Sequence, residues 1–422
     1  MALGKRTRWY FVTLLLAHGA IPNPPGNIPT PYSVHAPGLS RTWARVQDDM
    51  GFAPGAVMRF DINNTQPAEH TYLVIFSRSQ MPIGFQQIIP NLDDVGPYEP
   101  CFWRMPFYDR LDVTMFINAS GDDQYDIFIQ NMDGHEMDIY LSFGFENPGG
   151  RHLLVQDYSV ANVFQWFGPI FMISGVAYAI LLVTVWRRKT TKMHTLMASV
   201  FFLEAFYLFA QASFLNALDA GRNDWWRRWP AQLLDIIQRI AELMMFLMLS
   251  LGWKISRNNL NTCEMRFASV VSGTMFCLGL LHELWPYSGY LLSRDILKAF
   301  CDLVVIVAMN FNLQLLSAQI MNAPASLDAG KHYRKQKAYR DLRWIFFALI
   351  GSPTVETFIE DKVAPWDALW VSRALKLLIK WAIYVSLVVV FSPAMEPLRV
   401  FELTVQRDEE EVDAREMVLV VE

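Results

Sequence analysis

The sequence predicts a mixed membrane protein in which a small N-terminal β-sandwich precedes a bundle of seven transmembrane helices. Hydrophobic residues make up 53% of the 422 residues, and the mean hydropathy is +0.18. This composition is more apolar than that of a protein that meets water on all sides. The long apolar runs lie in residues 1–20 and from about Val163 onward, whereas residues 21–160 have the composition of a soluble domain.

Residues 1–20 are predicted to be a cleaved signal peptide. A basic segment at residues 5–8 precedes an apolar segment at residues 9–16, and small residues follow near Ala20. The apolar segment has about half of the roughly 20 residues that a transmembrane helix needs. We therefore expect the mature chain to start between Gly19 and Ile21, with a tilted membrane anchor as the alternative.

Residues 21–155 are predicted to form an antiparallel β-sandwich outside the cytoplasm. Segments rich in β-branched and aromatic residues alternate between apolar and polar positions, and turn residues separate them. Two glycosylation sequons, at Asn63 and Asn118, fit a domain that enters the secretory pathway. The domain's scarce cysteine gives no support to a disulfide framework. The expected strands cover residues 56–62, 71–77, 111–117, 124–130 and 137–145.

Residues 160–392 are predicted to form the transmembrane domain. Each apolar run has about the length that a hydrocarbon core demands. Gly351-Ser352-Pro353 is expected to break or kink the sixth helix, because proline removes a backbone donor. The expected spans are residues 163–186, 195–217, 231–253, 267–285, 296–321, 343–358 and 366–391.

The basic residues between these spans predict their orientation. Thirteen Lys and Arg fall in residues 187–194, 254–266 and 322–343, against five in the other three connections. Because positive residues favour the cytoplasmic side, this places the β-sandwich outside and the C-terminus inside. Residues 393–422 then form an acidic cytoplasmic tail, which is either a solvated disordered end or a docking segment for coat or adaptor proteins.

Ionisable and amide residues inside the predicted spans are the candidate functional residues. Burying a charge in a bilayer is costly, so such groups should face each other or a wet cavity. Glu204 and Glu242 should lie at similar depth and share a cation, for which Lys380 is the best candidate from another helix. The predicted intramembrane polar cavity comprises Glu204, Asp235, Arg239, Glu242, Asp302, Asn310 and Lys380.

Simpler interpretations of these charges remain open. Asp235 and Arg239 have the spacing of an intrahelical ion pair. Arg373 and Lys376 could extend to the outer membrane surface. A lysine on the seventh span is also typical of a retinal Schiff base, but a large ectodomain with a signal peptide does not fit that class.

The sequence predicts neither an enzyme nor a cofactor protein. It has no zinc-ligand spacing, no nucleophile elbow, no P-loop and no dinucleotide fingerprint, so we expect no catalytic residues, no cofactor and no metal site. The formal net charge of −5 offers no basic surface for nucleic acid.

The order of these parts resembles the GOLD-domain seven-transmembrane helix family of the secretory pathway, which includes Wntless and orphan receptor-like Golgi proteins. Local sequence agrees at residues 125–131 (YDIFIQN), 145–148 (FENP), 194–197 (HTLM) and 251–257 (LGWKISR). The paired ectodomain cysteines of many relatives are absent, since Cys101 alone is available there. The resemblance covers about Ala56 to Pro393 and implies a GOLD-like sandwich above a rhodopsin-like membrane domain.

The resemblance implies a non-enzymatic trafficking factor or cargo receptor of the Golgi and endosomal membranes or the plasma membrane. Its expected partners are membrane lipids, a lumenal protein or lipidated cargo, and a cytoplasmic coat, adaptor or G protein. A G-protein-coupled receptor is one alternative, although the third and seventh spans lack the acidic-Arg-aromatic and Asn-Pro-x-x-Tyr motifs. An ion channel or transporter is the other, favoured by the intramembrane charges.

Overall fold

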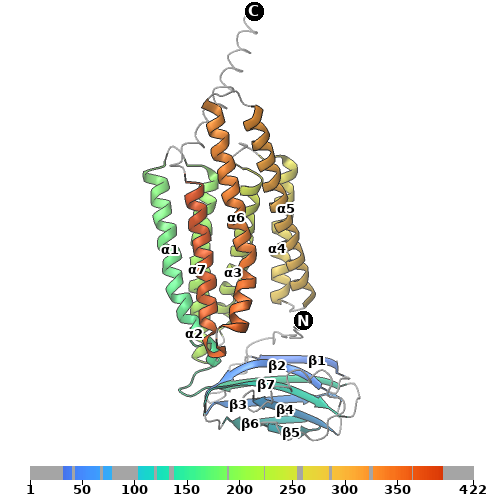
Figure 1. Cartoon of the computed structure of the whole chain (residues 1–422). Helices are drawn as coiled ribbons and strands as arrows, with labels where there is room; N and C mark the ends of the chain where they lie inside the picture. Colours follow the sequence, from blue (N-terminus) through green and yellow to red (C-terminus); the bar gives the residue numbers. More distant parts are fainter. Residues whose placement is uncertain are drawn as a thin grey trace, which may run out of the picture.

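The architecture was determined from a computed structural model of the whole chain (Figure 1). The predicted signal peptide, Asn118, Cys101 and the acidic tail lie outside the described residues. The structure describes residues 32–39, 43–66, 70–77, 103–117, 121–132, 137–187, 190–222, 224–253, 260–284, 288–322, 327–363 and 365–392.

The N-terminal region consists of two antiparallel four-stranded sheets. One has the order β1-β8-β3-β6 and the other β2-β7-β4-β5. Strand β3 pairs with β8 and β6 in continuous register, from Val57 opposite Glu146 and Phe116. The strands are β1 (Tyr32–Leu39), β2 (Trp43–Phe52), β3 (Val57–Asn64), β4 (Thr71–Ser77), β5 (Trp103–Phe107), β6 (Arg110–Phe116), β7 (Asp123–Asn131) and β8 (Met137–Glu146).

Large aromatic side chains fill the space between the two sheets. Phe52 on β2 contacts Tyr125 within its own sheet and Phe145 of the opposite sheet, with ring centroids 5.8 Å and 5.1 Å apart. All three side chains are buried, and burial raises the pKa of the Tyr125 hydroxyl to about 12. Because edge-on aromatic pairs gain free energy beyond their buried area, this contact holds the two sheets face to face.

Three strands were not predicted, and each breaks the simple alternating pattern. The pairing of β1 shifts register between Ala36 and Leu39. Strand β2 shifts twice against β7, around Gln47. Strand β5 contains Pro106 and lies at a sheet edge, where proline is tolerated. The five predicted strands match β3, β4, β6, β7 and β8 within two residues at each end.

Seven long helices follow within the described residues. Five helical segments are long and apolar enough to cross a membrane, namely those at Val155–Thr184, Lys192–Asp219, Thr262–Leu284, Leu292–Met321 and Lys335–Glu360. The two remaining helices, α3 and α7, carry three or more charged residues each. The helices are α1 (Val160–Thr184), α2 (Lys192–Asp219), α3 (Trp225–Ser250), α4 (Thr262–Leu284), α5 (Ser288–Asn322), α6 (Leu327–Lys362) and α7 (Leu369–Val390).

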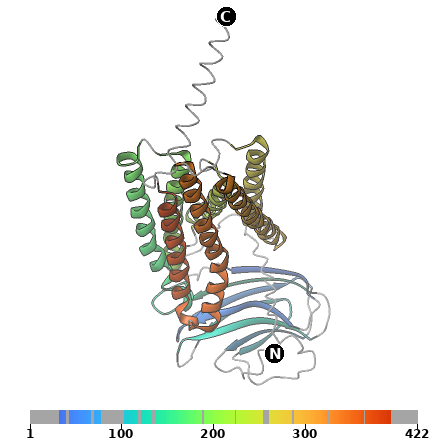
Figure 2. The ribbon, with the colours of Figure 1, turned by 45° about the horizontal axis from the view of Figure 1, so that its top comes forward.

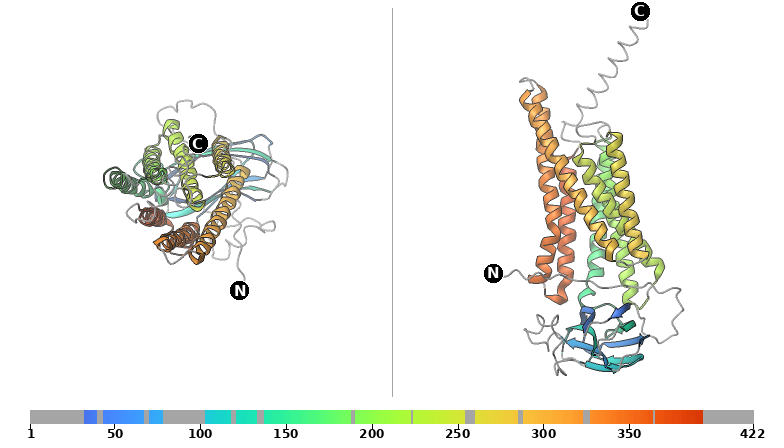
Figure 3. Two further views of the ribbon diagram at one scale, coloured as in Figure 1. Left: turned by 90° about the horizontal axis from the view of Figure 1, so that it is seen from above. Right: turned by 90° about the vertical axis from the view of Figure 1, so that its right-hand side faces the viewer.

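The helices stand side by side with the sandwich at one end of the bundle (Figure 1, Figure 2). Each helix packs against the next in sequence, α7 returns to α1 and α2, and α3 also contacts α5. At the end away from the sandwich, α5 and α6 extend beyond the other helices (Figure 3). Since α1 begins next to the sandwich, the C-terminal ends of α1, α3 and α5 lie at the opposite end of the bundle (Figure 1).

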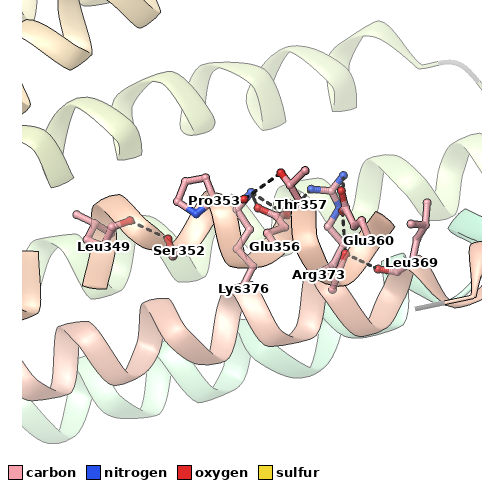
Figure 4. Close-up of polar contacts among 10 residues, drawn as sticks. Leu349, Ser352, Pro353, Glu356, Thr357, Glu360, Leu369, Arg373 and Lys376 are labelled. Atoms are coloured by element: carbon pink, nitrogen blue, oxygen red, sulfur yellow. Dashed lines mark hydrogen bonds and ion pairs between the residues drawn. The ribbon is translucent and has the colours of Figure 1, made fainter. Parts of the chain in front are cut away.

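Helix α6 is continuous through Pro353, so of the expected break or kink of the sixth helix, the break is wrong. A proline at this position removes the backbone donor that would bond the carbonyl of Leu349. The hydroxyl of Ser352 donates to that same carbonyl at 2.8 Å (Figure 4). The neighbouring side chain thus supplies the hydrogen bond that the proline cannot make.

A short joint connects the sandwich to the bundle. The side chain of Asn147 accepts from the amide of Ala53 at 3.0 Å and donates to the carbonyl of Leu153 at 2.8 Å. The amide of Gly51 donates to the buried side chain of Gln156 at 2.8 Å. An Arg151–Asp219 ion pair of 3.0 Å ties the segment to the end of α2. Strand β2 is therefore bound to residues that precede α1.

Trp366 closes this joint from the other end of the sequence. It begins the short 3₁₀ helix Trp366–Ala368 that leads into α7, and its ring lies against Gly51. A Cβ atom at position 51 would collide with the side chains of Gln156 and Trp366. The absence of a side chain at Gly51 thus permits the close approach of the sandwich to the bundle.

We expect Gly51→Ala to destabilise the protein by about 1–3 kcal/mol, because overpacking forces neighbouring groups apart. Thermal unfolding of the purified chain in mild detergent, followed by tryptophan fluorescence, measures the effect. Gly121→Ala is the matched control, since a Cβ there meets no atom within 4 Å. Equal melting temperatures for Gly51→Ala and the unsubstituted chain would contradict this account of the joint.

Candidate functional site: a buried ionic cluster

The core of the bundle contains a lysine held between two carboxylates. Lys380 on α7 contacts Glu204 on α2 at 2.6 Å and Glu242 on α3 at 3.4 Å, measured from Nζ to the nearer carboxylate oxygen. Glu204 is 1% exposed, and the Lys380 side chain is 19% exposed. The pairing expected from the similar depth of the two glutamates is present. Three helices far apart in sequence therefore meet at one ammonium group.

Gln238 and Tyr384 extend the cluster by two hydrogen bonds. The side-chain amide of Gln238 donates to the Tyr384 hydroxyl at 3.0 Å and to Glu242 at 3.3 Å. Both residues are buried, and each lies one helical turn from a charged member, Gln238 from Glu242 and Tyr384 from Lys380. The Gln238 amide thus gives a hydrogen bond to Glu242, the carboxylate that lies farther from the lysine.

Aromatic side chains enclose the cluster on the α1 and α2 side. The Tyr384 ring makes edge contacts with Phe171 on α1 and Phe201 on α2, at centroid distances of 5.9 Å and 5.4 Å. In such surroundings, two carboxylates and one ammonium leave one negative charge when all are ionised, which is costly to bury. A proton or a bound cation would balance that charge. The cluster could therefore respond to pH or to a cation by binding one positive charge.

Among the described residues, the other four predicted cavity residues make no hydrogen bond or ion pair with this cluster, although Asp235, Arg239 and Asp302 lie close enough to interact electrostatically with its glutamates. Asp235 and Arg239 form an ion pair of 2.8 Å within α3, the simpler of the two interpretations. Asn310 on α5 faces α6 and accepts from Arg343 at 3.5 Å. Asp302 on α5 is half-buried and, among the described residues, makes no hydrogen bond or ion pair with the cluster. Three of the seven residues therefore meet as a packed ionic cluster.

A second set of ion pairs joins α6 and α7 near the sandwich (Figure 4). Glu356 accepts from Arg373 at 2.9 Å and pairs with Lys376 at 2.8 Å. Glu360 accepts from the Ser372 hydroxyl at 2.8 Å. Glu356 therefore binds both α7 cations, and Glu360 lies 4.0 Å from Arg373. Both cations are also partly exposed, so the alternative in which they extend to the outer membrane surface stays open.

Four residues of these two clusters were not predicted from the sequence, namely Gln238, Tyr384, Glu356 and Glu360. A signal for the second cluster was available in the sequence. Glu356 and Glu360 are four residues apart and Arg373 and Lys376 are three apart, which is the spacing of two charged faces on neighbouring antiparallel helices.

No cluster of three or more His, Cys, Asp or Glu suited to a metal ion occurs in the part of the chain that the structure describes.

Comparisons with known proteins give little further information. No family model matches the sequence. No curated relative matches it either. Among solved structures, "Crystallographic Structure of Xanthorhodopsin, a Light-Driven Ion Pump with Dual Chromophore" aligns with 56% of this chain and 92% of that chain, at 13% identity and a TM-score of 0.32. A similarity of this size carries no argument about function.

We expect Lys380→Met to destabilise the bundle by about 3–5 kcal/mol, because Glu204 would be left buried without its cation. The double variant Lys380→Met with Glu204→Gln should regain part of this loss, since it removes the uncompensated charge. Melting temperatures of the full chain in detergent give both values. The matched control is Lys192→Met, which removes an exposed lysine at the start of α2. Strictly additive losses in the double variant would show that the pair is not coupled.

Proposed function

We propose that this chain is a non-enzymatic trafficking factor or cargo receptor of the secretory pathway, with seven membrane spans and a GOLD-like sandwich in the lumen. The joint between the sandwich and the bundle carries the proposal. Hydrogen bonds from Gly51 and Ala53, together with the Arg151–Asp219 ion pair, hold the sandwich at one end of the helices. A domain fixed in this way presents its outer faces to a lumenal partner at a constant height above the membrane.

Charge pairing supports the assignment of α3 and α7 as the two additional spans. Both helices carry charged residues and so fall outside the apolar set, but half of these charged groups have partners on neighbouring helices, and Asp235 pairs with Arg239 within α3. Lys380 is bound by Glu204 and Glu242, and Arg373 and Lys376 by Glu356. Paired charges inside a bundle are the form in which membrane helices tolerate ionisable residues.

The distribution of basic residues supports the proposed orientation. The basic segments follow α1, α3 and α5 in the sequence, and these three helices end away from the sandwich (Figure 1). Because lysine and arginine favour the cytoplasmic side of short connections, the sandwich belongs to the lumenal or extracellular side. The C-terminal tail then faces the cytoplasm, where a coat or adaptor protein could bind it.

A second candidate function is the transport of protons or cations, and the cluster at Lys380 favours it. Its two carboxylates, one cation and aromatic enclosure resemble the paired intramembrane charges of ion pathways in general. Flux assays on the purified chain in proteoliposomes separate the two functions. A proton or cation flux that Glu242→Gln abolishes would favour transport, and no flux would favour the trafficking role.

We expect loss of the protein to retain a defined set of secreted or lipidated proteins inside the cell, because a cargo receptor binds its clients before export. Comparing the secreted proteins of cells with and without the chain measures this effect. A photo-crosslinker at Phe116, an exposed position at the other end of the sheet from Asn63, should capture the same clients. The tagged chain should lie in Golgi or endosomal membranes, and residence only at the cell surface with unchanged secretion would refute the proposal.

The proposed orientation predicts that Asn63 carries an N-linked glycan. Its side chain is exposed near the end of β3, opposite Arg110 of β6 and Tyr140 of β8. Asn63→Gln should abolish one endoglycosidase-sensitive shift on a gel. Thr65→Ser keeps the sequon and is the matched control. Full-length protein that is never glycosylated at Asn63 in secretory cells would argue for the opposite orientation.

A further inference from the structure

A cavity of about 140 Å³ lies between α5 and α6, in the half of the bundle away from the sandwich. One lining residue, the apolar Leu313, comes from α5. The remaining lining residues come from one face of α6, because their spacing of three or four residues repeats with the helical turn. They are Tyr333, Gln336, Lys337, Arg340 and Arg343.

Two cross-helix hydrogen bonds frame the cavity. Gln336 donates to Ser317 at 2.7 Å, and Arg343 donates to Asn310 at 3.5 Å. The two bonds lie seven residues apart on each helix, which is about 10 Å along the axis. The cations of Lys337 and Arg340 lie between them on α6. These two bonds therefore tie α5 to α6 above and below the cavity and fix the spacing of the two helices over two turns.

The cavity is cationic and lacks compensating charge. Within the described part of the chain, no carboxylate lies within ion-pair distance of Lys337, Arg340 or Arg343, although Asp341 is on the same helix. The Nε atom of Arg343 is buried and has no hydrogen-bond partner among those residues. A buried guanidinium donor facing two further cations requires an anionic acceptor. Phosphate oxygens supply such acceptors in the geometry that arginine prefers.

The depth of the cavity indicates where the anion comes from. Trp344 directly follows Arg343 on α6, is 63% exposed, and has its ring centroid 5.9 Å from the Arg343 guanidinium. Exposed tryptophans gather at the level of lipid head groups. The apolar segment of α6 also begins at Lys335, within one turn of the cavity. The cavity therefore opens where the phosphates of a bilayer leaflet lie.

We propose that the cavity between α5 and α6 binds the phosphate of an anionic lipid head group in the leaflet opposite the sandwich. Basic residues that only set the orientation of the helices would lie in the connections between them. They would not need to line a cavity that contains a buried arginine donor without a hydrogen-bond partner. The site is separate from the cluster at Lys380 and does not depend on the trafficking role. Bound lipid phosphate would contact Arg340 and Arg343 of α6 beside Leu313 of α5, and the acyl chains would lie along Trp344.

The test measures lipid binding by the full chain in phosphatidylcholine nanodiscs. A fluorescent phosphatidylinositol phosphate is the probe, and inorganic phosphate and a soluble inositol phosphate are the competitors. Removing two cations near a lipid surface by Lys337→Gln with Arg340→Gln should weaken binding about 25-fold, since each contributes about a five-fold gain. Lys337→Arg keeps the charge and should retain binding.

The matched control is Arg187→Gln with Lys192→Gln, which removes two exposed cations at the same end of the bundle, next to α1 and α2. This variant should bind the lipid nearly as well as the unsubstituted chain. An equal loss in both double variants would mean that only diffuse surface charge attracts the lipid. Unchanged binding in the cavity variant, or full displacement by inorganic phosphate at the concentration of the lipid, would overturn the proposal.

Discussion

The pairing of Lys380 with Glu204 and Glu242 is the interaction on which the arrangement of the bundle depends. An ammonium group in an apolar core is tolerated only when carboxylates reach it, so α2 and α3 must present their glutamates to the same point on α7. This requirement fixes both the height and the rotation of three helices. Apolar packing alone is less specific, because leucine and phenylalanine can interdigitate in several registers.

The same constraint explains why charged helices belong to this bundle. Helix α7 carries three cations in its first half, and each has a carboxylate partner on α2, α3 or α6. Pairing of the two α7 cations nearest the sandwich with Glu356 places α6 antiparallel to α7 at the joint. Trp366, which connects these helices, is thereby directed toward Gly51. The intramembrane charges thus determine where the sandwich docks.

Much of the fold was predictable from local sequence, and the failures have physical causes. Alternating strands and long apolar helices follow from periods of two and 3.6 residues, which a sequence displays directly. Register shifts hid β1 and β2, and Pro106 hid β5, because each interrupts that period. The break expected at Pro353 was wrong because Ser352 restores the lost hydrogen bond.

The ionic cluster was partly predictable for a related reason. Depth along a helix follows from residue count, so Glu204, Glu242 and Lys380 could be assigned to one level. The rotation of each helix about its axis depends on packing against neighbours, which no local pattern encodes. Gln238 and Tyr384 were missed for that reason, and Asn310 was included although its side chain bonds Arg343 of α6.

The contact between Gly51 and Trp366 has a consequence for the synthesis of the protein. About 210 residues separate Gln156, the last residue of the joint near the sandwich, from Trp366. At the usual rate of about 5–20 residues per second, the ribosome needs roughly 10–40 s to make that segment. The sandwich therefore spends this interval with its Gly51 face uncovered while the helices are still being inserted.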